Sequence, residues 1–206
     1  MRGGSPVDPA KVEDAFKANP DARLFAFVHA ETSTGALSDA ATLAAIARRH
    51  DALTIMDCVT SLGGVPVLLD EWGIDAAYSG SQKCLSCTPG LSPVSFSEAA
   101  VARIKGRQGA CPSWFQDLGL VLGYWSGAKR TYHHTAPVNP LYGLHESLVI
   151  LAEEGLEAAW ARHRDNHLRL RAGLEALGMR FVVSEEARLP QLNSVWVPEG
   201  VDEAAA

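Results

Sequence analysis

The chain has 206 residues, 47% of them hydrophobic and 20% charged, with a formal net charge of −6. These proportions are typical of a globular protein of one or two domains with a buried core, and they argue against wholesale disorder. The acidic balance argues against nucleic acid as a partner, because a phosphate backbone binds basic faces. No membrane partner is expected either, since apolar runs such as Leu148–Ala152 fall far short of the roughly 20 residues that cross a bilayer. Met1–Pro6 has no apolar run behind it and is not a signal peptide.

The four cysteines are too few and too scattered for a disulfide framework in a chain of this size. We therefore expect reduced thiols and a cytoplasmic setting, with a peroxisome or another organelle left open. Cys84 and Cys87 have the spacing of a redox pair or of half a zinc site. No second Cys or His pair with ligand spacing accompanies them, so we expect no metal and interpret both as small, half-buried thiols.

Helical and strand patterns alternate along most of the chain. Capping residues and apolar periodicity predict helices over residues 8–19, 38–50, 97–105, 138–154 and 156–177. Apolar runs predict strands at Leu24–His29, Leu53–Met56, Ala76–Tyr78 and Val94–Phe96, with two further strand-like segments at 180–183 and 194–197. Leu24–His29 is nearly continuous in apolar residues, which is typical of a strand buried on both faces. The order indicates an α/β fold with a mostly parallel sheet and flanking helices.

Several aromatic, leucine and histidine side chains in the second half of the chain are interpreted as structural. Trp160 and the leucines spaced three and four apart in residues 138–154 and 156–177 are expected in the core. His133 and His134 are adjacent in an extended segment, so their rings are expected on opposite faces, where they cannot share one metal ion. His163 and His167 are interpreted as the polar edge of a packed helix face.

Two groups at the carboxyl ends of predicted strands carry the chemistry. Asp57 follows the second strand, and Ser79-Gly80-Ser81-Gln82-Lys83 follows the third. Ligands of open parallel sheets bind at this edge. Pyridoxal phosphate chemistry needs a lysine amine that forms a Schiff base and a carboxylate that holds the protonated pyridine nitrogen. Hydroxyl, amide and backbone donors beside the lysine suit the phosphate dianion.

Four segments together resemble the class V aminotransferases, and among them the alanine–glyoxylate and serine–glyoxylate aminotransferase family. They are His29-Ala30-Glu31-Thr32-Ser33-Thr34-Gly35, Asp57-Cys58-Val59-Thr60-Ser61-Leu62-Gly63-Gly64, Ser79-Gly80-Ser81-Gln82-Lys83 and Tyr132-His133-His134-Thr135-Ala136-Pro137. Each segment alone is weak evidence, but the four occur in the family's order and with its spacing. The resemblance implies the large domain of fold-type I pyridoxal phosphate enzymes and transfer of an amino group from serine or alanine to glyoxylate or a similar 2-oxo acid.

The resemblance also implies a role for each matching residue. Lys83 resembles the Schiff-base lysine and Asp57 the pyridinium partner, and both are the implied catalytic residues. The remaining cofactor-binding residues implied are Val59 against the ring, Thr32 near the ring oxygen, Gln82 on the phosphate, and Tyr132 and Thr135 on the phosphate of the other subunit of a homodimer. The implied division is 1–140 for part of the cofactor-binding large domain, 141–178 for connecting helices and 179–206 for the start of a small α/β domain.

Departures from the family leave two alternatives open. Nothing before Asp8 resembles the family's Gly/Ser-rich phosphate loop or the aromatic residue that stacks on the cofactor, and the family's substrate arginine would lie beyond Ala206. The chain is therefore also consistent with a catalytically incomplete fragment that acts only with a complementary half or partner subunit. The other alternative is a class V relative such as a cysteine desulfurase, although no nucleophilic cysteine on a mobile loop is identifiable.

Overall fold

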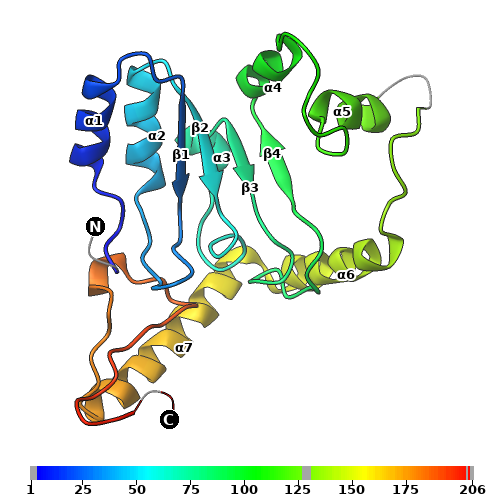
Figure 1. Ribbon diagram of the computed structural model, residues 1–206. Coiled ribbons are helices and arrows are strands. Elements are labelled where there is room, and N and C mark those ends of the chain that lie inside the picture. The colour runs from blue at the N-terminus through cyan, green and yellow to red at the C-terminus, as the bar shows by residue number, and fades with distance from the viewer. Residues whose placement is uncertain (1–3, 127–130, 203, 205–206) are drawn as a thin grey trace.

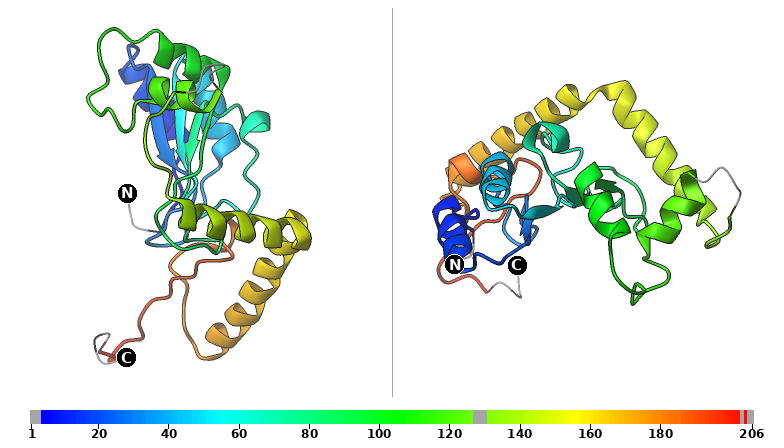
Figure 2. Two further views of the ribbon diagram at one scale, coloured as in Figure 1. Left: turned by 90° about the vertical axis from the view of Figure 1, so that its right-hand side faces the viewer. Right: turned by 90° about the horizontal axis from the view of Figure 1, so that it is seen from above.

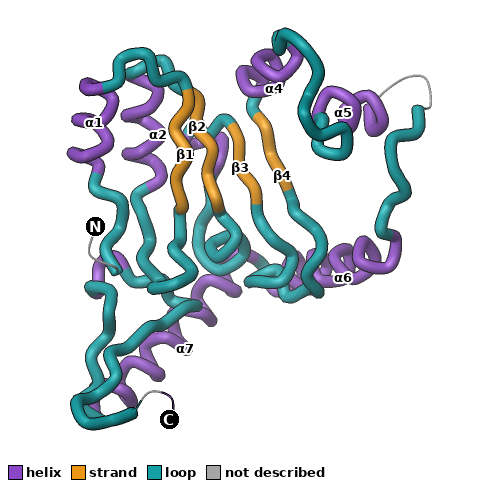
Figure 3. Tube along the Cα trace, viewed as in Figure 1, coloured by secondary structure: helices purple, strands orange, loops and turns teal. Residues whose placement is uncertain are grey.

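A computed structural model describes residues 4–126, 131–202 and 204 (Figures 1 and 3). The elements are α1 (Pro9–Ala18), β1 (Leu24–Val28), α2 (Ala40–Arg49), β2 (Leu53–Asp57), α3 (Leu69–Trp72), β3 (Ala76–Tyr78), β4 (Val94–Phe96), α4 (Glu98–Lys105), α5 (Leu118–Ser126), α6 (Val138–Glu154), α7 (Leu156–Ala176) and the 3-10 turn η1 (Glu185–Ala187). The predicted start of the first helix at Asp8 is confirmed, and the second helix is capped by Asp39. Asp8 accepts from the Ala10 N–H at 2.9 Å, and Asp39 accepts from the Thr42 N–H at 3.0 Å.

The four strands form one mixed sheet in the order β1-β2-β3-β4 (Figure 3). β1, β2 and β3 are parallel, with Val28, Asp57 and Tyr78 side by side at their carboxyl ends. β4 runs antiparallel to β3. The predicted α/β class with a mostly parallel sheet is confirmed, and a helix or loop returns the chain between each parallel pair.

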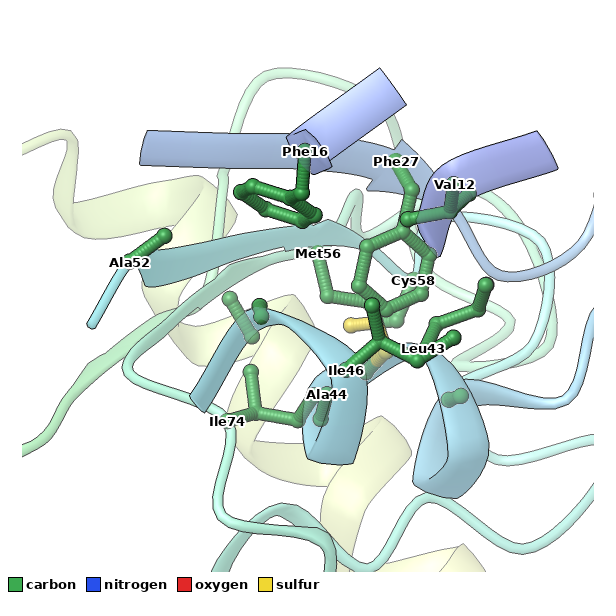
Figure 4. Close-up of a cluster of buried hydrophobic side chains, with 13 residues drawn as sticks. Val12, Phe16, Phe27, Leu43, Ala44, Ile46, Ala52, Met56, Cys58 and Ile74 are labelled. Atoms are coloured by element: carbon green, nitrogen blue, oxygen red, sulfur yellow. The ribbon is translucent and has the colours of Figure 1, made fainter. Parts of the chain in front are cut away.

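The main core lies between the sheet and the first two helices (Figures 1 and 4). Its buried residues are Val12, Phe16, Phe27, Ala40, Leu43, Ala44, Ile46, Ala47, Ala52, Met56, Cys58, Ile74 and Ala77. Phe27 of β1 and Met56 of β2 contribute from the sheet, whereas α1 and α2 contribute their apolar faces. Burial of these side chains fixes the parallel strands and therefore the positions of the loops that follow them.

The prediction that the first strand is buried on both faces is wrong. β1 is an edge strand of the sheet, and Leu24 and Val28 are 56% and 36% exposed. Phe27 is the one β1 residue that is buried. A continuous apolar run fits an interior parallel strand, but the position of a strand in the sheet depends on which other segments pair with it.

The prediction that the leucines of the long helices belong to the core is also wrong. None of the described residues of α6 is buried, and Leu141 and Leu148 are 43% and 45% exposed. Leu141, Leu144, Leu148 and Leu151 instead line an open apolar groove of about 730 Å³, which Leu85, Val94 and Trp125 also line. Trp160 of α7 is half-buried, and its indole nitrogen lacks a hydrogen-bond partner in the described part of the chain.

The two long helices meet at a sharp bend at Gly155, whose φ of +85° lies in the left-handed region that favours glycine (Figure 2). Beyond α7 the two predicted strand-like segments pair with each other, through the antiparallel bridge Phe181↔Val195 and a bond from the Val182 N–H to the Ser194 carbonyl at 3.0 Å. They are too short to form a regular strand pair. Between these segments the chain returns to the loop after β1, where the Leu189 N–H donates to the Gly35 carbonyl at 2.8 Å. Among the described residues, no helix is long and apolar enough to cross a membrane.

Candidate active site

Three loops meet at the carboxyl edge of the parallel strands, at the lower end of the sheet in Figure 1. Residues 29–37 follow β1, residues 58–64 follow β2 and residues 79–91 follow β3. The predicted residues Thr32, Asp57, Val59, Gln82 and Lys83 all lie on or beside these loops. The parallel order of the strands therefore gathers five of the seven predicted site residues at one edge.

Asp57, the last residue of β2, is held at both carboxylate oxygens. Its Oδ1 accepts from the Val59 N–H at 2.9 Å, and its Oδ2 accepts from the hydroxyl of Tyr78 at 2.7 Å. Tyr78 is directly opposite Asp57 in the parallel β2–β3 register. Sequence reasoning missed Tyr78, although its position at the end of the neighbouring predicted strand is a signal that could have found it.

Val59 and Gln82 both lie close to Gly80. A Cβ added at Gly80 would lie 2.7 Å from the Gln82 Oε1 and 3.4 Å from the Val59 Cγ1. The absence of a side chain at this position therefore lets the loop after β2 approach the segment that leads to Lys83. Gln82 is exposed, whereas Val59 is half-buried.

Lys83 stands in a turn of a tightly bonded loop. Ser81, which is fully buried, donates its hydroxyl to the Thr88 carbonyl at 2.6 Å, and its N–H donates to the Leu91 carbonyl at 3.1 Å. The Ser86 N–H donates to the Lys83 carbonyl at 2.9 Å. Within the described part of the chain, the half-buried Lys83 amine has no hydrogen-bond or ion-pair partner. The loop thus fixes the backbone of Lys83 and leaves its amine available.

Thr32 and Thr60 link the first two loops, with hydroxyl oxygens 2.5 Å apart. The backbone carbonyl of Thr60 accepts from the Gln191 amide at 3.0 Å. This contact spans 131 positions of the chain, and no local sequence signal points to Gln191. Gly64 makes room for it, since an added Cβ would lie 2.2 Å from the Gln191 Nε2.

His29 and Ser61 form a second buried link between the same loops, with the imidazole Nδ1 2.9 Å from the hydroxyl oxygen. The Ser61 hydroxyl also lies 3.3 Å from the Cys58 carbonyl oxygen. Burial lowers the pKa of His29 to about 4, partly opposed by the charge of Asp39. His29 is therefore neutral at neutral pH and acts as a fixed link between the two loops.

The structure does not bring Tyr132 and Thr135 to this edge. Their hydroxyl oxygens are 2.5 Å apart, both residues are exposed, and Tyr132 has 72% of its surface accessible. No hydrogen bond between described residues connects either side chain to Asp57 or Lys83. The segment that carries them connects α5 to α6, at the right of Figure 1, and its residues His134, Ala136 and Pro137 line the apolar groove.

The prediction that His133 and His134 point to opposite faces is wrong. Their Nδ1 atoms lie 2.8 Å apart, and His133 is buried against the Trp114 ring with centroids 4.2 Å apart. The His133 Nε2 is 3.0 Å from the Trp114 carbonyl. The alternation of side chains holds for a regular strand, and the irregular backbone here lets both rings turn to one side.

The cysteines are all free thiols. Burial raises the pKa of Cys58 to about 11, with the Asp57 charge adding to the effect, and burial also raises the pKa of Cys84. The predicted half-burial of Cys84 and Cys87 is confirmed. The described residues contain no group of three or more His, Cys, Asp or Glu side chains placed to hold a metal ion. His167 is buried and bonds Asn193 across 2.6 Å, whereas His163 is half-buried, which agrees with the polar edge of a packed face.

Known proteins match the chain over nearly its whole length. The family model Aminotransferase class-V matches residues 4–205. Alanine–glyoxylate aminotransferase of Mus musculus is 39% identical over 193 residues, which are 92% of this chain and 46% of that protein. (S)-ureidoglycine–glyoxylate transaminase of Bacillus subtilis is 34% identical, over 97% of this chain and 52% of that protein. The crystal structure of alanine–glyoxylate aminotransferase from Nostoc sp. superposes with a TM-score of 0.94 and 42% identity, over 98% of this chain and 53% of that one. The chain thus spans about half the length of the relatives it matches.

Proposed function

Because the chain belongs to the class-V aminotransferase family, we propose that it forms the cofactor-binding part of a pyridoxal phosphate-dependent aminotransferase. One observation carries the proposal: Asp57, held at both oxygens, and the unpartnered Lys83 amine lie on adjoining loops at the carboxyl ends of neighbouring parallel strands. A fixed carboxylate and an available amine are the two groups that this cofactor needs from a protein.

The residues at this edge fit the cofactor. Lys83 would hold it through its amine, and the Asp57 carboxylate would bond the pyridine nitrogen. Val59 would pack against the ring, Thr32 would lie near the ring oxygen and Gln82 would donate to the phosphate. When bound, the cofactor supplies a ring that accepts electrons from the substrate carbon.

Lys83 would also act on the substrate. Its Nζ would be the group that takes the proton from the substrate Cα and carries it. A proton carrier needs a flexible side chain on a fixed backbone, and the bonds of Ser81 and Ser86 fix the backbone around Lys83.

The substrates follow from the relatives. All three proteins reported above carry glyoxylate in their names, beside alanine in two of them and ureidoglycine in the third. We infer that the acceptor is glyoxylate or a similar small 2-oxo acid and that the donor is a small amino acid, alanine or serine. Assay of a panel of donors against glyoxylate, with glycine as the measured product, tests this assignment.

We further infer a homodimer with shared sites. Tyr132 and Thr135 are exposed and bonded to each other. This hydroxyl pair would suit the phosphate of the other subunit. The inferred division of the chain is 1–140 for the large domain, 141–178 for the connecting helices and 179–206 for the start of a small domain.

The proposal is tested by adding pyridoxal phosphate to the purified chain and reducing the mixture with borohydride. We expect an absorbance band of the bound cofactor and, by peptide mass spectrometry, a pyridoxyl group on Lys83. Lys83→Ala should lose both, whereas Lys105→Ala on the exposed part of α4 should keep them. Labelling that persists in Lys83→Ala would contradict the role of Lys83.

Two other outcomes distinguish the alternatives. If the chain binds the cofactor only after addition of a second polypeptide, the fragment interpretation replaces the proposal. Release of sulfide from cysteine would instead favour a desulfurase. The raised pKa values of Cys58 and Cys84 argue against these two residues as the nucleophile, because the nucleophile is a thiolate.

A further inference from the structure

Tyr78 contacts Asp57 at the carboxyl edge of the sheet, where the cofactor is proposed to bind. It is the last residue of β3, and its hydroxyl donates to the Asp57 Oδ2 at 2.7 Å. This is the short distance of a hydrogen bond to a charged acceptor. We propose that Tyr78 is a positioning residue, whose hydroxyl fixes the plane of the Asp57 carboxylate for the pyridine nitrogen of the cofactor. The inference rests on the function proposed above.

The carboxylate of Asp57 needs two donors to be fixed. The torsion that rotates a carboxylate is broad, so a single bond to the neighbouring Val59 N–H leaves the group free to tilt. Val59 belongs to the loop that directly follows Asp57, whereas Tyr78 belongs to the next strand, and the two donors bind different oxygens. A carboxylate has about four acceptor positions, so each oxygen of Asp57 keeps one for the cofactor.

The strand register places the phenol at this position. Asp57 and Tyr78 are Cα partners in the parallel β2–β3 pair, and both end their strands. The Cys58 N–H donates to the Tyr78 carbonyl at 2.9 Å, which closes the pair at the backbone as well. Since the chain leads from Tyr78 directly into the loop of Lys83, the same bond connects the carboxylate to the element that carries the amine.

Core packing does not account for this tyrosine. Tyr78 is 42% exposed, whereas Ala77 beside it is 5% exposed and packs in the core. A phenylalanine would supply the same ring at this half-exposed position. Packing therefore explains the aromatic ring but not the hydroxyl that bonds Asp57. The hydrogen bond to Asp57 also raises the pKa of Tyr78, with smaller contributions from burial and from the charge of Asp57.

The bond can be measured without the cofactor. In protein labelled with ¹³Cζ-tyrosine, Tyr78 should ionise at a higher pH than free tyrosine. Asp57→Asn should move the ionisation of Tyr78 to lower pH, whereas Asp70→Asn in the exposed helix α3 should leave it unchanged. If Tyr78 ionises like free tyrosine, or if Asp57→Asn leaves Tyr78 unaffected, the bond is absent and the inference is overturned.

The positioning role is measured on the full chain with pyridoxal phosphate. We expect Tyr78→Phe to weaken cofactor binding by roughly three- to tenfold, as for loss of one typical hydrogen bond, and to shift the pH dependence of the bound-cofactor absorbance. Tyr142→Phe, at an exposed tyrosine of α6, should change neither quantity, and circular dichroism should show that both variants are folded. Equal binding and equal pH dependence in the two variants would overturn the role of Tyr78. A wild-type chain that takes up no cofactor would instead overturn the proposed function, and the positioning role with it.

Discussion

The imidazole Nδ1 of His29 lies 2.9 Å from the hydroxyl oxygen of Ser61, and both side chains are buried. The pair joins the loop after β1 to the loop after β2, which begins beside Asp57. The Thr32–Thr60 contact joins the same two loops closer to the surface. A neutral, buried histidine thus helps to hold the edge at which the cofactor is proposed to bind.

His29 should make the stability of the chain depend on pH. Burial lowers its pKa from 6.5 to about 4, so between these values the unfolded chain binds a proton that the folded chain does not. The free energy of unfolding should therefore fall as the pH falls from about 6.5 to about 4, by up to about 3 kcal/mol from this group. Urea denaturation over this range should show a shallower decline in His29→Asn. If the free energy of unfolding falls equally with pH in His29→Asn and in the wild type, His29 is not the group responsible. His145→Asn on the exposed part of α6 is the control and should keep the wild-type dependence.

Asp57→Asn should weaken binding of pyridoxal phosphate. The amide keeps the shape of the side chain but removes the charge that would hold the protonated pyridine nitrogen. Loss of a hydrogen bond between charged groups predicts roughly ten- to a hundredfold weaker binding. Fluorescence or absorbance titration measures the dissociation constant, with Asp70→Asn in the exposed helix α3 as the matched control. Equal affinities of the two variants would remove Asp57 from the proposed site.

Gly64→Ala should destabilise the chain. An added Cβ would lie 2.2 Å from the Gln191 Nε2 and 2.8 Å from the Cys84 Sγ, so Gln191 must leave the Thr60 carbonyl. Overpacking of this kind costs about 1–3 kcal/mol in the free energy of unfolding. Gly173→Ala in α7 meets nothing within 4 Å, and alanine there should stabilise the helix by about 0.5–1 kcal/mol. Thermal or urea unfolding measures the stability of the two variants. Similar changes in both would argue against the close approach of Gln191 to Gly64.

The ring contact between His133 and His134 predicts their tautomers. The Trp114 carbonyl can only accept, so the His133 Nε2 carries the proton that it receives. The Nδ1 of neutral His133 is then an acceptor, and the Nδ1–H of His134 is its donor. ¹⁵N NMR of the imidazole nitrogens at neutral pH should show these two different tautomers. The same tautomer in both rings would show that the contact is not formed in solution.

Local signals in the sequence determined much of the secondary structure. Asp8, Asp39 and Ser97 were identifiable as caps, because each places an acceptor before an apolar-periodic segment, and all three accept from the first turn of their helix. Gly155 separates α6 from α7 as its conformational freedom predicts. The ends of β2 and β3 were also predictable, and with them the placement of Asp57 and of the loop that carries Lys83 at one edge.

Tertiary structure alone decided which side chains meet at that edge. The Tyr78–Asp57 bond depends on strand register, and Gln191 reaches Thr60 from 131 positions away. The exposure of β1 and of the α6 leucines was likewise undetermined by periodicity. Periodicity and capping report hydrogen bonds within a few residues, whereas burial depends on which distant segments pack together.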